Sequence, residues 1–387
     1  MSDSQLSPQF ADRVERVEPS ATIAVSNLAS ELKSQGKDVV DLSVGEPDFP
    51  TPENVVEAGK DALDAGHTTY TPSSGIPALR EAIASKLRDD GIDADPGELI
   101  VTPGGKQALF ETVQALIDDG DEVVLLDPAW VSYEAMVRIA GGDLTRVDTT
   151  PHDFQLEPAL DALGEAVSDA TQMLVVNSPS NPTGAVYSDA AMAGVRDLAV
   201  EHDITVVSDE IYGRVTYGTE QASLASFDGM SDRTVTINGF SKAYSMTGWR
   251  LGYLHAPEGV VDQAGKIHSH SVSCATNFVQ HAGVEALQNT DAEVERMRDS
   301  FRERRDILVD ILADVGVDVS LPDGAFYLML PVDNDDQAWC EAALEESYVA
   351  TVPGSAFNAP GYARISYAAS EERLREAVDR LVSDGFL

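Results

Sequence analysis

The chain has 387 residues, of which 66 are acidic and 26 are lysine or arginine, giving a formal net charge of −40. A field of this sign repels phosphate backbones and anionic lipid, which argues against nucleic acid and membrane surfaces as partners. Because the acidic residues are dispersed and do not form a tail, we expect a surface adapted to molar salt, where screening weakens self-repulsion.

Composition also bears on size and location. An apolar content of 43% over this length fits a soluble, globular chain with one large or two ordinary domains. Residues 1–10 show no basic stretch followed by an apolar one, so we expect no secretory signal. Cys274 and Cys340 are isolated in the sequence, which indicates free thiols in a reducing cytoplasm.

Helical periodicity alternates with short β-branched runs along most of the chain, which indicates an α/β protein with a largely parallel sheet. We expect helices near 20–36, 53–65, 75–90, 105–118, 188–202, 259–288 and 291–314. Strands are expected at Leu99–Thr102, Val123–Leu126, Met173–Val176, Thr205–Val207 and Thr234–Ile237. From about residue 290 a second pattern, helix, strand, helix, strand, helix, predicts a smaller α+β domain that the N-terminal segment joins.

The last long helix, near 291–314, carries a cluster of arginines interleaved with acidic residues. This arrangement is typical of a solvated helix face. We therefore assign to solvent the five arginines Arg296, Arg298, Arg302, Arg304 and Arg305.

Four of the expected strands lead directly into polar residues. The segments that follow them are 127–130, 177–184, 208–212 and 238–242. In open α/β sheets, ligands bind outside the carboxyl ends of the strands. The sequence therefore predicts a ligand site at this edge of the sheet.

The segment Pro103-Gly104-Gly105 lies between a strand and an amphipathic helix. Two glycines allow close approach of the backbone to a ligand, and a helix start presents free N–H groups, so the segment can hold a phosphate. Arg250 offers a second, bidentate anchor for the same group. The alternatives are a plain turn and an ordinary surface arginine.

Lys242 is one of seven lysines and stands in a stretch that looks half buried. A lysine amine condenses with an aldehyde when it is deprotonated, which requires a desolvated or cation-flanked setting. Asp209 at a sheet edge could pair with a protonated ring nitrogen, as a pyridoxal cofactor requires. Tyr212 could donate to a phenolate, and Trp130 offers a stacking surface.

Each of these residues also has a purely structural interpretation. Lys242 could be an exposed surface lysine, and Asp209 could be a helix N-cap. Tyr212 and Trp130 could be core residues, while Asn181 and the proline after it could form a turn. Found together at one sheet edge, they favour a cofactor site.

The order and spacing of motifs resemble those of pyridoxal-phosphate aminotransferases of fold type I, in the class I aspartate aminotransferase group. The match runs through PSAT, GEPDF, YTPSSGIPALREAI, GGKQALF, NSPSNPTGAVY, VSDEIY, SKAYSMTGWRLGY and ARISYA. This resemblance implies a large domain with a mixed, mainly parallel seven-stranded sheet between helices, plus a smaller α+β domain. The implied division is 1–47 as N-terminal arm and part of the small domain, 48–289 as the large cofactor-binding domain, and 290–387 as the small domain.

The resemblance also implies residue roles. The catalytic residues would be Lys242, Asp209 and Tyr212. Lys242 would carry pyridoxal 5′-phosphate as a Schiff base and move the proton between substrate Cα and cofactor C4′. Asp209 would lie at the ring nitrogen and Tyr212 at the phenolic oxygen. Asn181 would join Tyr212, and Trp130 would stack on the ring. The phosphate would be held by Gly104, Gly105, Lys106 (through its backbone), Ser241, Arg250 and, from the other subunit of a homodimer with shared active sites, Tyr70. Substrate would contact Gly45, Trp130, Asn181 and Arg364, the last as the α-carboxylate clamp.

The substrate side chain is less clearly indicated. In the branch of this family that acts on dicarboxylic substrates and prephenate, a basic residue precedes PSAT and a second stands on the cofactor-side helix. Here these positions are read as Glu18 and Gln114, with Arg16, His268 or His270 as possible substitutes.

The function implied is amino transfer from an L-amino acid, aspartate in first place, to 2-oxoglutarate by ping-pong kinetics. The alternatives are an aromatic or other neutral amino-acid aminotransferase, a cysteine-conjugate β-lyase, or a cofactor-binding regulator without turnover. Seven histidines without an HExxH motif give no reason to expect a metal.

Overall fold

The computed structural model describes residues 10–219, 222–333 and 335–387. The segment in which we looked for a secretory signal lies almost entirely outside these residues. Within the described part of the chain, no helix is long and apolar enough to cross a membrane.

A seven-stranded sheet forms the centre of the molecule, with the strand order β2-β8-β7-β6-β5-β3-β4. Strand β8 is antiparallel to both of its neighbours, and the other pairs are parallel. The five expected strands are therefore confirmed. The sheet has two further strands, β4 at one edge and β8 between β2 and β7. Their bounds are β2 Leu99–Thr102, β3 Glu122–Asp127, β4 Asp143–Asp148, β5 Thr171–Asn177, β6 Thr205–Asp209, β7 Thr234–Gly239 and β8 Gly252–His255.

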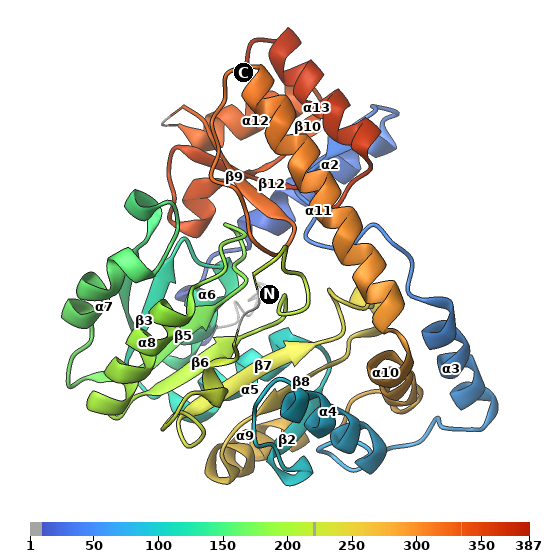
Figure 1. The fold of residues 1–387 in the computed structure, drawn as a ribbon, viewed down its shortest axis with the longest axis vertical. Helices are drawn as coiled ribbons and strands as arrows, with labels where there is room; N and C mark the ends of the chain where they lie inside the picture. Colours follow the sequence, from blue (N-terminus) through green and yellow to red (C-terminus); the bar gives the residue numbers. More distant parts are fainter. Residues whose placement is uncertain (1–9, 220–221, 334) are drawn as a thin grey trace, which may run out of the picture.

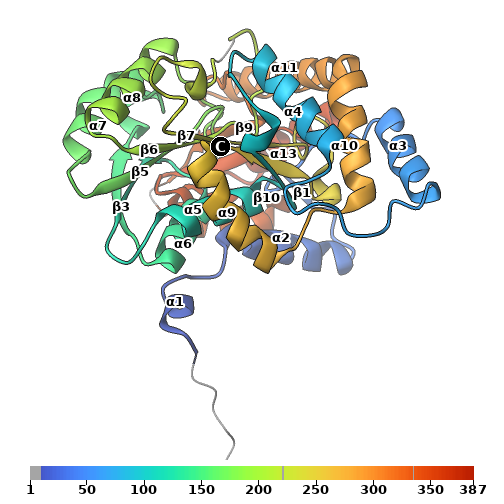
Figure 2. The same cartoon turned by 90° about the horizontal axis from the view of Figure 1, so that it is seen from below.

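Helices cover both faces of this sheet, because alternate apolar side chains of the same strands point to opposite sides. Val124 and Leu126 pack in one core with α7 and α8, while Val123 and Leu125 pack in another with α5, α6 and α9. Figure 2 shows these two groups of helices on opposite sides of the sheet. The helices around this sheet are α3 Glu53–Asp64, α4 Pro77–Asp89, α5 Gly105–Leu116, α6 Val131–Ala140, α7 Leu160–Ala166, α8 Asp189–Glu201, α9 Glu258–Ser271 and α10 Asn277–Asn289.

The single helix expected over 259–288 is wrong, since α9 and α10 are separate helices. The chain turns between them, and Ser273 adopts a left-handed conformation with φ of 67°. Short polar and β-branched residues in the linking SVSCAT stretch are poor helix formers, which explains the break.

A second core joins the chain's N-terminal part to its last hundred residues. Strand β1 (Val40–Asp41) pairs with β10 (Val349–Ala350), and β9 (Tyr327–Pro331) with β12 (Tyr362–Ser366) and β11 (Val352–Pro353) forms a small antiparallel sheet. The remaining helices are α1 Asp12–Glu15, α2 Ala21–Ser34, α11 Asp291–Asp314, α12 Asp336–Glu346 and α13 Glu371–Ser383. The long α11 runs from beside α10 into this upper region (Figure 1). This arrangement supports the proposed grouping of 1–47 with 290–387.

The face of α11 that we assigned to solvent is partly buried. Arg305 is 7% exposed, its Nη1 donates to the carbonyl of Pro322 at 2.8 Å, and its guanidinium lies 4.8 Å from the Tyr217 ring centre. Arg304 bonds to Asp48 at 2.7 Å. Charge interleaving alone could not reveal this, because arginine buries its stem and planar head against aromatic surfaces.

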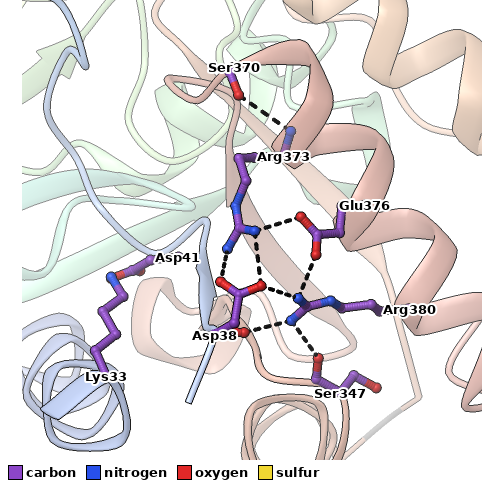
Figure 3. Close-up of polar contacts among 8 residues, drawn as sticks. All are labelled: Lys33, Asp38, Asp41, Ser347, Ser370, Arg373, Glu376 and Arg380. Atoms are coloured by element: carbon purple, nitrogen blue, oxygen red, sulfur yellow. Dashed lines mark hydrogen bonds and ion pairs between the residues drawn. The ribbon is translucent and has the colours of Figure 1, made fainter. Parts of the chain in front are cut away.

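An exposed ion-pair network ties the segment before β1 to the C-terminal helix α13 (Figure 3). Asp38 accepts hydrogen bonds from Arg373 at 2.9 Å and from Arg380 at 2.7 Å. Glu376 bonds to the same two arginines. Arg373, as the strongest partner, holds the pKa of Asp38 below its ordinary value.

Candidate active site

A cavity of about 660 Å³ opens at the carboxyl ends of the parallel strands. This is the edge where the sequence placed a ligand site. Eleven of the thirteen predicted site residues line it: Gly45, Gly105, Lys106, Trp130, Asn181, Asp209, Tyr212, Ser241, Lys242, Arg250 and Arg364. Gly104 and the exposed Tyr70 are not among the lining residues.

Lys242 follows β7 and enters the cavity from the loop that begins there. Its Nζ donates a hydrogen bond to the carbonyl of Gly45. Burial, assisted by the charges of Arg364 and Arg250, lowers its pKa to about 8. About a tenth of this amine is therefore neutral at pH 7, far more than for an ordinary lysine, and the neutral form is the one a nucleophilic lysine requires.

Asp209 ends β6 and is 4% exposed. Its Oδ2 accepts from the Tyr133 hydroxyl at 2.7 Å, and its Oδ1 accepts from the Ile211 N–H at 3.1 Å. Burial, opposed by these bonds and by Lys242, raises its pKa to about 6. Because an ionised carboxylate has about four acceptor sites, it can still accept from a cationic N–H in the cavity, which would stabilise its charged form.

Two residues around Asp209 were missed from the sequence. Tyr133 on α6 orients the carboxylate directly, and Asn177 at the end of β5 bonds to the Asp209 carbonyl at 2.9 Å and to the Asn181 N–H at 2.8 Å. The rule on strand ends could have found Asn177, which we had read as part of the polar segment without a role. Tyr133 gave no such signal, since an aromatic residue in a first helical turn looks like core.

The start of α5 and Arg250 together form a cationic cradle. Gly104, the N-cap residue with φ of 88°, supplies no side chain to the free N–H groups of the first turn. A Cβ at this position would lie 2.7 Å from Nη2 of Arg250, so glycine is required for the approach. Ser241 also lines the cavity. N–H groups, a hydroxyl and a guanidinium suit a phosphate.

Arg364 lies in β12 and is 3% exposed. Its Nη1 donates to Oδ1 of Asn181 at 2.9 Å and its Nη2 to the carbonyl of Ser43 at 2.7 Å, while Nε is buried without a partner. A guanidinium has five donors, so hydrogens on the terminal nitrogens remain for a ligand carboxylate. Two neutral acceptors leave its charge uncompensated, which favours an anion in the cavity.

Tyr212 and Tyr327 lie in the same core and join two distant parts of the chain. Tyr212 follows β6, Tyr327 begins β9, and their hydroxyls are 2.8 Å apart. Lys242 Nζ lies 5.6 Å from the Tyr212 ring centre. Tyr327 was not among the predicted site residues, because its motif reads as a buried strand.

Trp130 and Lys106 form another side of the cavity. Lys106 Nζ lies 4.7 Å from the centre of the Trp130 ring, and burial together with the charge of Arg250 lowers its pKa. We had assigned Lys106 through its backbone alone, but its side chain also points along this wall.

Among the described residues, the cavity lining includes none of the side chains considered for the distal end of the substrate. Arg16 lies near Asp119 at 3.7 Å, and Gln114 bonds to the Met136 carbonyl. His268 is fully buried against Glu111 at 3.0 Å. Placing the second basic position at Gln114 was therefore wrong: the cation that α5 brings to the cavity is Lys106, two turns earlier. His270, the third possible substitute, and Glu18, which occupies the first of the two basic positions, do not line the cavity either.

Comparison with known proteins decides the family. The model for "Aminotransferase class I and II" matches residues 37–381. The chain belongs to this family. It is a pyridoxal-phosphate-dependent aminotransferase, and its mixed, mainly parallel seven-stranded sheet is that of fold type I.

Relatives match this aminotransferase over nearly its whole length. An aspartate/prephenate aminotransferase from Thermus thermophilus is 46% identical over 376 residues, covering 95% of this chain and 96% of that protein. An aspartate aminotransferase from Geobacillus stearothermophilus is 41% identical, covering 96% and 98%. The solved structure of the Thermus thermophilus aspartate aminotransferase with maleate is 45% identical, covers 97% of this chain and 100% of that one, and has a TM-score of 0.94.

The residues of this cavity fit pyridoxal phosphate on their own chemistry. The cradle at α5 suits the phosphate, and the depressed pKa of Lys242 suits bonding to the aldehyde. Asp209 retains capacity for the ring N–H, and Tyr212, which also lines the cavity, carries a hydroxyl that would suit the ring's phenolic oxygen as a donor.

Proposed function

We propose that this aminotransferase transfers the amino group of an L-amino acid, aspartate in first place, to 2-oxoglutarate by ping-pong kinetics. The observation that carries the proposal is the convergence of Lys242, Asp209 and Arg364 on one cavity. The names of the two relatives support aspartate as the donor. Maleate, a dicarboxylate, in the related structure supports a substrate with two acidic groups.

The proposed mechanism assigns one task to each residue. Bound pyridoxal phosphate supplies an aldehyde and an electron-accepting ring. The neutral Lys242 amine would hold the aldehyde, and as a free amine it would accept the proton from the substrate Cα and deliver it to the cofactor's C4′. Asp209 keeps the ring N–H protonated, and Tyr133 and Asn177 hold Asp209 in place.

The same assignment orients the substrate. The guanidinium of Arg364 binds the α-carboxylate, with Asn181 and the Ser43 carbonyl fixing its plane. Gly105, the Lys106 N–H, Ser241 and Arg250 would hold the cofactor's phosphate, and Trp130 would offer its face to the ring. Holding the Cα–H bond in one direction relative to Lys242 supplies much of the rate.

We assign the distal carboxylate of aspartate to the side chain of Lys106. Among the described residues lining the cavity, the cations are Lys106, Lys242, Arg250 and Arg364, and the last three already have partners in the proposed mechanism. The Lys106→Gln variant should raise KM for aspartate and 2-oxoglutarate by about tenfold or more, because it removes a charge-assisted bond. KM for alanine should change less; equal losses for both donors would exclude this assignment.

A panel of amino donors with 2-oxoglutarate tests the function itself. Aspartate should give the highest kcat/KM, and double-reciprocal lines at several acceptor concentrations should be parallel. Aromatic donors, prephenate as acceptor and a cysteine conjugate belong in the panel, since a preference for one of them would identify the alternative enzyme. If no amino acid changed the absorbance of the bound cofactor, the protein would be a regulator without turnover.

We also propose a homodimer with shared active sites. Tyr70 is 86% exposed and does not line the cavity of its own chain, which is consistent with a role in a second copy. Mixing Lys242→Ala chains with Tyr70→Ala chains should give hybrid dimers in which one site is intact, and therefore more activity than either parent. Absence of any gain from hybrids that do form would contradict the shared site.

We further propose a reducing cytoplasm as the location and salt as a stabiliser. Cys274 and Cys340 are free, and burial raises the pKa of the Cys340 thiol to about 12, which keeps it inert. With a net charge of −40, the melting temperature should rise from low salt to molar KCl. A constant or falling melting temperature would contradict the salt adaptation.

A further inference from the structure

Tyr327 contacts three parts of the site at once. It is fully buried, and its hydroxyl lies 2.8 Å from that of Tyr212. Its ring centre is 4.5 Å from the Arg364 guanidinium carbon. A Cβ at Gly45 would come within 2.8 Å of the Tyr327 oxygen, so the close fit at this point depends on glycine.

The two hydroxyls carry one proton each, so only one of them can donate in the bond between them. Burial raises the pKa of both tyrosines, so each keeps its single proton at neutral pH. Either oxygen can act as the donor in the bond between them. If Tyr212 spent its proton on Tyr327, it would have none left to donate to a cofactor atom in the cavity.

We propose that Tyr327 is a positioning residue that donates to Tyr212 and so directs the Tyr212 proton toward the cofactor's phenolic oxygen. A hydroxyl that accepts a bond is also a stronger donor, because hydrogen bonds in a chain polarise one another. Tyr327 belongs to β9 and Tyr212 to the loop after β6, so this bond joins the small-sheet region to the cofactor region. The inference rests on the role proposed above for Tyr212, which Tyr212→Phe tests separately.

The ring of Tyr327 has a second task, which is to support Arg364. A guanidinium stacked on an aromatic face is held in one plane and gains cation–π attraction. Arg364 and Tyr212 therefore contact different atoms of one side chain, so the hydroxyl and the ring can be tested apart.

The hydroxyl is tested by the pH titration of the bound cofactor's absorbance, which follows the proton on the nitrogen linking Lys242 to the cofactor. A donor on the phenolic oxygen competes with that proton for the oxygen, so weaker donation raises the titration midpoint. Tyr327→Phe should raise the midpoint by about 0.5–1 pH unit. The matched control is Tyr367→Phe, a fully buried tyrosine of the same core that does not line the cavity, which should leave the midpoint unchanged.

A double variant separates positioning from a general structural effect. In the Tyr212→Phe background, Tyr327→Phe should cause no further rise, since the proton it directs is gone. An equal rise in both backgrounds, or no rise when Tyr212→Phe alone gives one, would overturn the proposal. If Tyr212→Phe itself caused no rise, the proposed role of Tyr212 would fail, and with it the basis of this inference.

The ring is tested by binding of maleate to the holoenzyme. Tyr327→Phe keeps the ring and should change the dissociation constant by less than about twofold. Tyr327→Leu removes it and should weaken binding by about three- to tenfold. Equal weakening by both variants would contradict support through the ring.

Discussion

Asp209 in the cavity and Asp38 in the surface network are both carboxylates beside cationic groups, yet the protein treats them in opposite ways. Asp38 is exposed, is bonded to two arginines and has a lowered pKa. Asp209 is buried beside tyrosine and backbone donors and has a pKa raised to about 6. Burial without full charge compensation prepares Asp209 for a cationic ligand, whereas Asp38 is already satisfied.

The same contrast separates the arginines of the two regions. Arg380 shares its donors among Asp38, Glu376 and the Ser347 carbonyl, so its charge is neutralised within the chain. Arg364 has neutral partners and a buried Nε without one. A functional site can therefore be recognised by charges that the fold leaves unpaired, and a structural cluster by charges that it pairs.

Removing the amine should produce the largest effect. Lys242→Ala is expected to lower kcat/KM for amino transfer by at least about a thousandfold, because it deletes both the cofactor's anchor and the proton carrier. Lys266→Ala is the matched control, since Lys266 bonds to Gln263 on the exposed face of α9. Borohydride reduction followed by digestion should place the cofactor on the peptide with Lys242; an active Lys242→Ala variant would refute the assignment.

Neutralising the buried carboxylate comes next. Asp209→Asn should lower kcat by about a hundredfold or more, because the ring N–H loses its anionic partner. In the cofactor-free protein Asp209 is protonated below its pKa of about 6 and charged above it. Affinity for pyridoxal phosphate, measured by fluorescence titration, should therefore rise between pH 5 and 7 in the parent. The same rise in Asp209→Asn would show that another group controls it.

Exchanging the clamp should have a smaller effect. Arg364→Lys loses the planar, two-pronged geometry, so KM for the amino donor should rise by about tenfold or more while the cofactor's absorbance stays the same. Arg380→Lys makes the same exchange in the paired network and should leave KM unchanged. Similar KM values for both variants would remove the distinction between the two regions.

The weakest effect is expected in the network itself. Asp38→Asn should lower the melting temperature by no more than about 3 °C, since exposed ion pairs stabilise little. The difference from the parent should shrink in molar KCl, because salt screens exposed pairs. A large loss of stability that persists in salt would show that this network resembles the buried site more than we infer.

Much of the fold could be read from the sequence because its signals are local. Strands β2, β3, β5, β6 and β7 are short runs rich in apolar and β-branched residues, and Gly104 and Gly105 mark the helix start at the cavity. Lys242 and Asp209 stand in stretches whose chemistry is readable from residue type and neighbours, whereas Arg364 was assigned through the family resemblance. Local signals failed where SVSCAT broke one expected helix into α9 and α10, since periodicity continues on both sides of the break.

Other features depended on contacts between distant segments. Tyr133, Tyr327 and the buried Arg305 are ordinary core or surface residues by local pattern, and their partners lie far away along the chain. The sequence by itself determined most of the helices and strands, the order of the motifs and the types of side chain that follow the strands at the sheet edge. Which charges remain unpaired was decided by tertiary structure alone, because desolvation and hydrogen-bond satisfaction depend on what packs around a group in space.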